Sequence, residues 1–362
     1  MLATSRFWHF SAATFLSCCT LSALAQGILP PSPSERVQLT TQINAQLIVA
    51  AKNDHNLAIL QGILNQPEDS IDLAKAEVTI EKMIDPTVNE ADTLKQLDAL
   101  AATVRARFPQ GDTTDNEIKA GILISTLNDA GPWNGNRPYH YDLDNPLGNA
   151  PRDKLLSNYL ASRKGNCVSM PVLFVIIGQK LGMPVTLSTA PLHDFAKFKR
   201  DNGAWMNIEV TSYGTISDEH YQQQMDITPR ALATGIYLQT LTRKESVLVL
   251  MDTLMQFYRH HRPADQQLAM TTLAIMTSTK DVQAWLWRGD AYGQMADERF
   301  LNKYGSAENI PPAMRNDYMA LNENNLLAFQ KAEELGWVEE TPKHKADYLQ
   351  SIQKVKATKQ GS

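Results

Sequence analysis

Cysteine is scarce in this sequence. Only three of the 362 residues are cysteines, and two of them, Cys18 and Cys19, fall within the first 25 residues. Cys167 is therefore a lone thiol in the rest of the chain, which excludes a framework of internal disulfides. The sequence also lacks a closely spaced set of cysteine and histidine ligands, so it predicts no metal site. Cys167 is then either a small buried hydrophobic residue or a thiol that takes part in chemistry.

Runs of basic residues and glycine-rich phosphate loops are also missing. The formal net charge is −5 and the pI is about 5.9, so we expect no nucleic-acid partner. No segment has the pattern of a loop that cradles phosphate groups, and we expect no cofactor. Hydrophobic residues make up 43% of the chain and charged residues 20%, which is typical of an ordinary globular protein.

Long hydrophobic runs are confined to the N-terminus. Arg6 supplies a positive charge, and residues 10–24 are mostly apolar or small, a run too short to span a bilayer comfortably. Ala23-Leu-Ala25 fits the small-x-small pattern of a cleavage site before Gln26. This pattern predicts a signal peptide at residues 1–25, with an uncleaved membrane anchor as the alternative. We therefore expect an exported, periplasmic protein with no membrane contact after cleavage.

Apolar spacing predicts helices in the N-terminal part of the chain. Residues 26–65 read as a lead-in followed by a first helix. In residues 70–84, apolar side chains recur at i, i+3, i+7, i+10 and i+11, which places them on one helical face. Pro86 ends this helix. Similar patterns predict helices at residues 94–108 and 115–128, with the apolar faces packed in a core.

Residues 131–149 have neither a helical nor a strand period. The segment is rich in Gly, Pro, Asn, Asp and Tyr, and it is long for a simple connection. It contains Trp133, Tyr139 and Tyr141. Either these aromatic residues line a substrate cleft in a binding or lid loop, or they pack beneath an ordered covering loop.

A nearly all-apolar segment follows Cys167. Residues 172–181 predict a helix that is buried on all sides, and Gly182-Met-Pro184 ends it. Pro171 is best tolerated in the first turn, where its missing N–H breaks no hydrogen bond. The helix should therefore start near residues 166–168, with Cys167 at its N-terminus.

Three strand-like runs come next, at residues 185–189, 194–199 and 205–211. Asp201-Asn-Gly203 lies between the last two and predicts a hairpin. The hairpin loop length decides which side chains share a face of the sheet.

With three loop residues, Phe195 opposes Glu209, and His193 lies diagonally beside Glu209 on the same face. With two, Glu209 turns to the opposite face. We predict the three-residue loop, with Glu209 as the partner of His193. Asn207 is the alternative partner, because it lies two residues before Glu209 and shares its face of the strand. Asp194 follows His193 directly along the strand and should point away from it.

Cys167, His193 and Glu209 have the residue types of a nucleophilic cysteine site. The thiolate is the nucleophile, and the positive end of a helix dipole favours it. A histidine can pair with the thiolate and later protonate the leaving group, and a carboxylate can fix the histidine tautomer. The backbone N–H of Cys167 is the first expected oxyanion donor, with Asn158 and Asn166 as candidates for a second.

The C-terminal part of the chain returns to helical patterns, at residues 245–259, 266–276, 282–295 and 317–335. Residues 284–292, with 328–332 later, have the small and aromatic rhythm of a tetratricopeptide helix pair. We divide the chain into a signal peptide (1–25), an N-terminal lead-in and helix (26–65), a core (66–225), a helical tail (226–350) and a flexible C-terminus (351–362).

Over residues 71–292, several motifs resemble the SirB-type branch of the transglutaminase-like cysteine protease superfamily. They are Ile71-Asp-Leu-Ala74, Gly135-Asn136, Tyr139-His-Tyr141, Arg163-Lys-Gly165, Pro191-Leu-His193 and Arg288-Gly289. The third predicted strand also resembles the superfamily's third catalytic strand, with Glu209 two residues before Thr211 where Asp is commoner.

The resemblance implies an α+β fold. Its parts are a helix-rich transglutaminase-like core, in which a small antiparallel sheet packs on a central helix, and an all-α tetratricopeptide-like tail. It also implies the catalytic order cysteine, histidine, acid, which Cys167, His193 and Glu209 follow.

Two functions remain open. The first is an exported cysteine hydrolase or acyl-transferase that acts on amide bonds of a peptide or protein, with a cell-wall peptide as one candidate substrate. The second is a non-catalytic binding protein, in which the tail and residues 131–149 engage a protein or peptidoglycan partner. Many proteins of the SirB-type branch lack the cysteine, so its presence here favours the enzyme.

Overall fold

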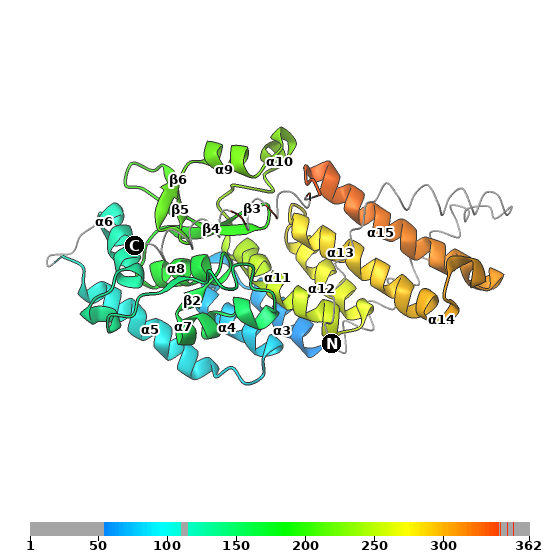
Figure 1. Cartoon of the computed structure of the whole chain (residues 1–362), viewed down its shortest axis with the longest axis horizontal. Coiled ribbons are helices and arrows are strands. Elements are labelled where there is room, and N and C mark those ends of the chain that lie inside the picture. Colours follow the sequence, from blue (N-terminus) through cyan, green and yellow to red (C-terminus); the bar gives the residue numbers. More distant parts are fainter. Residues whose placement is uncertain (1–53, 110–114, 340, 342–345, 347–349, 351–362) are drawn as a thin grey trace.

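The structure, a computed structural model, describes residues 54–109, 115–339, 341, 346 and 350. The predicted signal peptide (1–25), the lead-in up to residue 53 and the predicted flexible C-terminus (351–362) lie outside the described residues. Figure 1 shows a small sheet beside the N-terminal helices, with the last helices extending to the other side.

The N-terminal helices begin at side-chain caps. Asp54, Asp72, Asn89 and Asp115 each accept a hydrogen bond from a backbone N–H in the first turn of the helix that follows. Pro86 lies just beyond the second of these helices, as the sequence predicts. The helices are α3 (His55–Leu64), α4 (Leu73–Ile84), α5 (Glu90–Ala106) and α6 (Asn116–Asn128).

The loop after α6 is anchored by a short parallel pair of strands, β1 (His140–Tyr141) and β2 (Lys164–Gly165). Helix α7 (Leu156–Ser162) lies between them in the sequence. The residue that joins α7 to β2, Arg163, has a φ of +61°, and its guanidinium donates to the carbonyl oxygens of Asn134 and Arg137. This contact closes the start of the loop onto the residues that precede Cys167.

Four strands form one antiparallel sheet in the order β3-β4-β5-β6. They are β3 (Val185–Ala190), β4 (His193–Lys199), β5 (Trp205–Glu209) and β6 (Gly214–Ile216). The first three are the strands that the sequence predicts. We did not predict β6, because its three residues are too few to show an alternating pattern.

The hairpin between β4 and β5 has a three-residue loop. Lys199 pairs with Trp205, and the backbone N–H of Arg200 donates to the carbonyl oxygen of Ala204, which encloses residues 201–203. The glycine at the third loop position has a φ of +86°, the left-handed conformation that such loops require. The predicted register is confirmed, and it places Glu209 on the same face of the sheet as His193.

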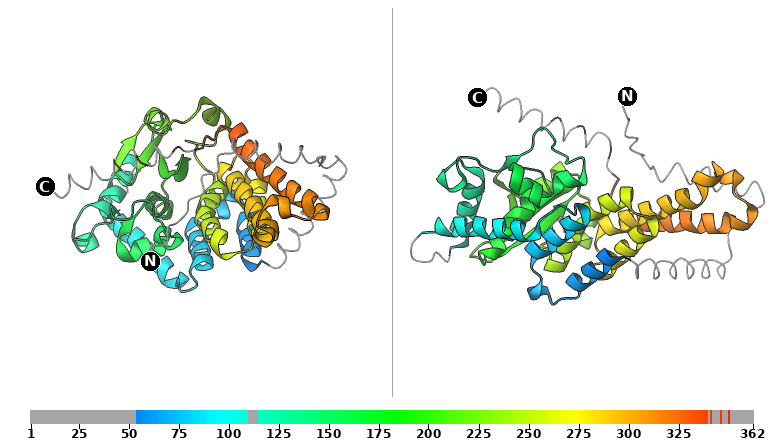
Figure 2. Two further views of the ribbon diagram at one scale, coloured as in Figure 1. Left: turned by 45° about the vertical axis from the view of Figure 1, so that its right-hand side comes forward. Right: turned by 90° about the horizontal axis from the view of Figure 1, so that it is seen from below.

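The C-terminal region is all-helical. In the right-hand view of Figure 2, α13 and α15 project together away from the sheet. They approach closely at Gly289, where a Cβ atom would lie 2.6 Å from the ring of Phe329. The helices are α9 (Asp218–Gln224), α10 (Pro229–Thr234), α11 (Arg243–His261), α12 (Ala264–Thr277), α13 (Val282–Ala296), α14 (Asn302–Tyr304) and α15 (Arg315–Leu335), with a π-helical segment (Asp297–Leu301) after α13.

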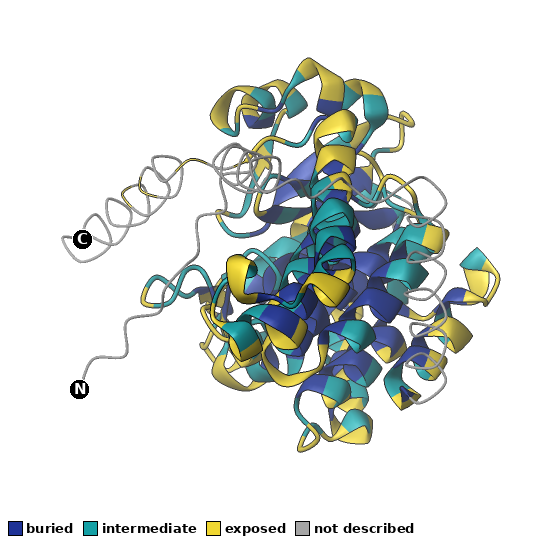
Figure 3. Cartoon of the chain, turned by 90° about the vertical axis from the view of Figure 1, so that its right-hand side faces the viewer, coloured by how far each residue is buried: buried dark blue, intermediate teal, exposed yellow. Residues whose placement is uncertain are grey.

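The buried residues lie on the inner faces of these helices (Figure 3). The expected α+β class is confirmed, with a helix-rich body, a small antiparallel sheet and a helical C-terminal region. The tetratricopeptide-like character of that region stays a prediction. None of the helices in the described ranges is long and apolar enough to cross a membrane.

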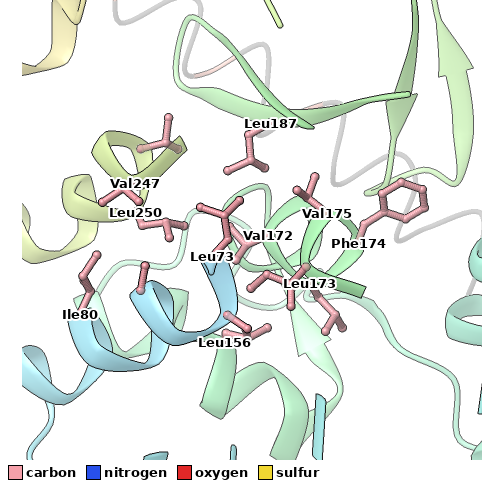
Figure 4. Packing of buried hydrophobic residues seen from close by; sticks show 14 of the residues in the cluster. Leu73, Ile80, Leu156, Val172, Leu173, Phe174, Val175, Leu187, Val247 and Leu250 are labelled. Carbon is pink, nitrogen blue, oxygen red and sulfur yellow. The ribbon is translucent and has the colours of Figure 1, made fainter. Parts of the chain in front are cut away.

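Helix α8 (Ser169–Lys180) is the buried centre of the molecule. Its residues 169–178 are all buried, as the apolar sequence predicts. Figure 4 shows Val172 and Val175 of α8 in one cluster with Leu187 of β3 and Val247 of α11. The hydrophobic cluster around α8 therefore continues across the predicted boundary at residues 225 and 226, and the division into domains stays a prediction.

Close packing of α8 against the sheet depends on Gly178, because a Cβ atom there would lie 2.6 Å from Val185 Cγ2. We expect Gly178→Ala to lower the free energy of unfolding by about 1–3 kcal/mol through overpacking. Gly121→Ala in α6 is the control, because nothing lies within 4 Å of its added Cβ. That variant should gain up to about 1 kcal/mol from helix propensity. Urea unfolding measures both changes, and equal stabilisation by the two variants would contradict the packing argument.

Candidate active site

Asn166 holds Cys167 at the N-terminus of α8. Its Oδ1 accepts hydrogen bonds from the backbone N–H groups of Val168 (3.0 Å) and Ser169 (3.2 Å). Its Nδ2 donates to the carbonyl oxygen of Asp153 at 2.9 Å. The cap starts the helix just after the predicted position and leaves Cys167 at the positive end of the helix dipole.

The thiol of Cys167 is half-buried and forms no disulfide. Its Sγ lies 3.9 Å from the carbonyl oxygen of Leu192, the residue before His193. Interaction with the Cys167 side chain is also one of the causes that raise the pKa of His193. The structure therefore brings the predicted nucleophile and the predicted base together.

His193 is the first residue of β4 and has a buried ring. Its Nε2 lies 2.6 Å from Glu209 Oε2. Because Nε2 is used in this contact, Nδ1 is the ring nitrogen left for Cys167. The ring lies against Tyr221, with 5.9 Å between ring centroids, so its orientation is held by packing as well as by hydrogen bonds.

Four hydrogen bonds surround the carboxylate of Glu209. The hydroxyl of Tyr221 donates to Oε2 at 2.6 Å, the oxygen that also contacts His193. The backbone N–H and the hydroxyl of Thr211 donate to Oε1 at 3.0 and 2.5 Å. Each carboxylate oxygen thus has two donors, which compensates for removing the charge from water.

Burial alone would lower the pKa of His193 and raise that of Glu209. For His193, the interactions with Cys167 and with the Glu209 carboxylate outweigh burial and raise the pKa to about 10. For Glu209, the hydrogen bond and charge of His193, with the bonds from Thr211 and Tyr221, lower the pKa to about 2. At neutral pH this contact is therefore an imidazolium paired with a carboxylate.

The two other polar residues considered for the third position have different surroundings. Asn207 Nδ2 donates to Asp218 Oδ1 at 2.7 Å, and Lys197 Nζ donates to the same oxygen at 3.0 Å. Asp194 pairs with Thr189 across the sheet and, one residue on from His193, points to the other face. Its pKa is raised to about 6 by burial, against the charges of His193 and Lys154. Glu209 is thus the carboxylate that contacts the imidazole.

The aromatic residues of the loop at 131–149 are occupied in packing. The guanidinium of Arg107 lies 3.6 Å from the ring centroid of Trp133. Tyr139 and Tyr141 are buried, and the Tyr141 hydroxyl donates to the carbonyl oxygen of Pro146 at 2.9 Å. These contacts fit a covering loop, and a role of the three rings in a substrate cleft stays a prediction.

The two side chains proposed as oxyanion donors, Asn166 and Asn158, have different hydrogen-bonding environments. The amide of Asn166 is committed to the cap of α8 and to Asp153, so its side chain is not free to bind an oxyanion. Asn158 lies half-buried in α7 and stays a candidate. Among the described residues, no three His, Cys, Asp or Glu side chains lie close enough to hold a metal ion.

Tyr221 is the site residue that the sequence did not reveal. It lies on the short helix α9 and is buried against Phe195, with 4.5 Å between ring centroids. Its hydrogen bond to Glu209 spans 12 positions and depends on how α9 folds back over the sheet. No periodicity or spacing in the sequence indicates that contact.

The comparison with known protein families places the site in context. Residues 91–248 match the model of the Transglutaminase-like superfamily. The chain contains a transglutaminase-like domain. The match extends from α5 into α11 and includes Cys167, His193 and Glu209. No curated protein and no solved structure matches the chain.

The ion pair in the transglutaminase-like domain predicts a defined pH dependence of stability. The pKa of His193 is raised from 6.5 to about 10, so its contribution is fully present below pH 6.5 and is lost as the pH rises through 10. The pKa of Glu209 is lowered from 4.5 to about 2, so its contribution is present above pH 4.5 and is lost as the pH falls through 2.

We therefore expect Glu209→Gln to cost roughly 3–5 kcal/mol between pH 4.5 and 6.5, because it leaves a buried imidazolium unpaired. Urea unfolding across pH 3–10 should show the difference from wild type shrinking as the pH rises. Glu117→Gln is the control, because its ion pair with Arg200 is exposed and should contribute less than about 1 kcal/mol. A Glu209→Gln cost that stays constant from pH 5 to pH 10 would contradict the assignment.

Proposed function

We propose that this protein is an exported cysteine hydrolase or acyl-transferase that acts on amide or peptide bonds through Cys167, His193 and Glu209. The observation that carries the proposal is the buried 2.6 Å contact between His193 Nε2 and Glu209 Oε2, with the other ring nitrogen left for the thiol. This arrangement can activate a nucleophilic thiol. The transglutaminase-like domain at residues 91–248 supports the same reaction class.

The acylation step begins with the thiolate of Cys167. Because the pKa of His193 is about 10, its imidazole is protonated at neutral pH, and an imidazolium favours a thiolate partner. The sulfur attacks the carbonyl carbon of the substrate, and a C–S bond forms as the C–N bond breaks. His193 gives its Nδ1 proton to the leaving amine. The products are a free amine and a thioester on Cys167.

The deacylation step reverses the proton movement. Water in a hydrolase, or an amine in a transferase, attacks the thioester carbonyl and passes a proton to the neutral imidazole of His193. The C–S bond breaks and the thiolate returns. Glu209 keeps the ring in place and stabilises its charge throughout, because its own four hydrogen bonds prevent it from moving.

The N-terminus of α8 provides the expected oxyanion site. The backbone N–H of Cys167 is the first donor, and it lies at the positive end of a helix of 12 residues. The substrate would be a peptide or a protein. A cell-wall peptide is the candidate that fits an exported enzyme.

Cys167 should react with iodoacetamide at pH 7 faster than a free model thiol does, because an adjacent imidazolium favours the thiolate. His193→Ala should slow the reaction at least about tenfold, and Glu209→Gln should slow it less. Mass spectrometry of the tryptic peptides measures the rate at Cys167 separately from that at Cys18 and Cys19.

His55→Ala is the matched control, since it removes a histidine that is exposed on α3 rather than one that lies on β4. It should leave the labelling rate within about twofold of wild type. If wild-type Cys167 reacts no faster than the model thiol, the proposed enzymatic function is rejected. The alternative, a non-catalytic binding protein, is then favoured.

The proposed export predicts a processed N-terminus. Cleavage after Ala25 would leave Gln26 as the first residue. Expression of the full chain in a Gram-negative bacterium, followed by fractionation and N-terminal sequencing, should find the processed form in the periplasm. Ala25→Arg should block processing, because the cleavage site requires a small residue there. Unprocessed wild-type protein in the cytoplasm would contradict export.

A further inference from the structure

The turn between β3 and β4 presents an apolar side chain beside the thiol. Ala190 pairs with His193, so Pro191 and Leu192 form a two-residue loop. Leu192 has a φ of +51°, and 71% of its surface is exposed. Both features are unfavourable for leucine, since the left-handed region suits glycine or asparagine and water disfavours an exposed isobutyl group.

The position of Leu192 relative to Cys167 follows from one distance. Its carbonyl oxygen lies 3.9 Å from Cys167 Sγ. The carbonyl oxygen and Cβ of one residue are about 3 Å apart by covalent geometry, so Cβ of Leu192 lies within roughly 7 Å of the sulfur. A substrate carbonyl carbon bound at that sulfur would therefore have its flanking groups within reach of the leucine side chain.

Within the described part of the chain, the Leu192 side chain is packed to a small extent, since 71% of its surface is exposed. A proline followed by a residue of positive φ is the pattern of a type II turn, in which glycine or asparagine would cost less. The Leu192 carbonyl contact to Cys167 is made by the backbone and does not require a leucine. Neither the turn nor this backbone contact calls for a leucine at position 192.

We propose that Leu192 is a specificity-determining residue that contacts an apolar group next to the reacting carbonyl of the substrate. This inference rests on the proposed function and narrows its substrate class to amides with an apolar side chain beside the scissile bond. Binding would cover the exposed leucine and remove apolar surface from water on both partners. Charged neighbours would be disfavoured, because Leu192 cannot replace their hydration.

Two alkylating probes with the same reactive carbon test this inference on the full chain. Iodoacetamide has no apolar group, and N-benzyl iodoacetamide adds one. We expect wild-type Cys167 to prefer the benzyl probe, and Leu192→Gly and Leu192→Asn to lower the ratio of the two rates about tenfold. Leu192→Gly removes the positive-φ strain, so its Tm should equal or exceed that of wild type, which separates lost recognition from lost folding.

Met276→Ala is the control, because Met276 is 80% exposed on α12 and forms no part of the site. It should leave the ratio unchanged. An unchanged ratio in Leu192→Gly overturns the specificity role. The absolute alkylation rate of Cys167 tests the proposed function separately. The ratio of the two probe rates can still be measured when the thiol reacts slowly. Slow reaction with both probes therefore rejects the nucleophile, whereas fast reaction with an unaltered ratio rejects only Leu192.

Discussion

The buried contact between His193 and Glu209 is the interaction on which the arrangement of the surrounding elements depends. Two ionised groups taken out of water are stable only when their remaining hydrogen-bonding capacity is filled. Glu209 meets this condition with donors from Tyr221 and Thr211 in addition to His193. These donors come from the start of β4, the residues after β5 and helix α9. The small sheet and the helix over it are therefore parts of one electrostatic arrangement.

The thiol reaches this arrangement from a different element. Helix α8 is buried on all sides, so its position relative to the sheet is determined by close packing rather than by a few surface contacts. Asn166 ties the start of the helix to Asp153, and the turn before β4 brings the Leu192 carbonyl to the sulfur. Core packing, the Asn166 side chain and the turn before β4 thus fix both halves of the site, which suits chemistry that tolerates little displacement. The same turn carries the strained, exposed leucine.

The first of the long C-terminal helices, α11, packs against the elements that hold the site. Val247 and Leu250 of α11 belong to the hydrophobic cluster that surrounds α8, and Leu73 of α4 lies in the same cluster. The family match also ends inside α11 rather than before it. Removing the helical region at residue 226 would expose this apolar surface, so the transglutaminase-like domain depends on at least α11 for its core.

Local patterns in the sequence were enough to predict the N-terminal helices, the buried helix after Cys167, and the hairpin register that puts Glu209 beside His193. Apolar period, proline position and loop parity act between residues that are near one another in the chain, so they can be read directly. Only the tertiary structure decided four other features. They are the burial of Tyr139 and Tyr141, the role of Asn166 as a helix cap, the hydrogen bond from Tyr221 to Glu209, and the exposure of Leu192. Each depends on which distant element packs against the side chain, and burial and hydrogen-bond partners follow from that packing rather than from residue type.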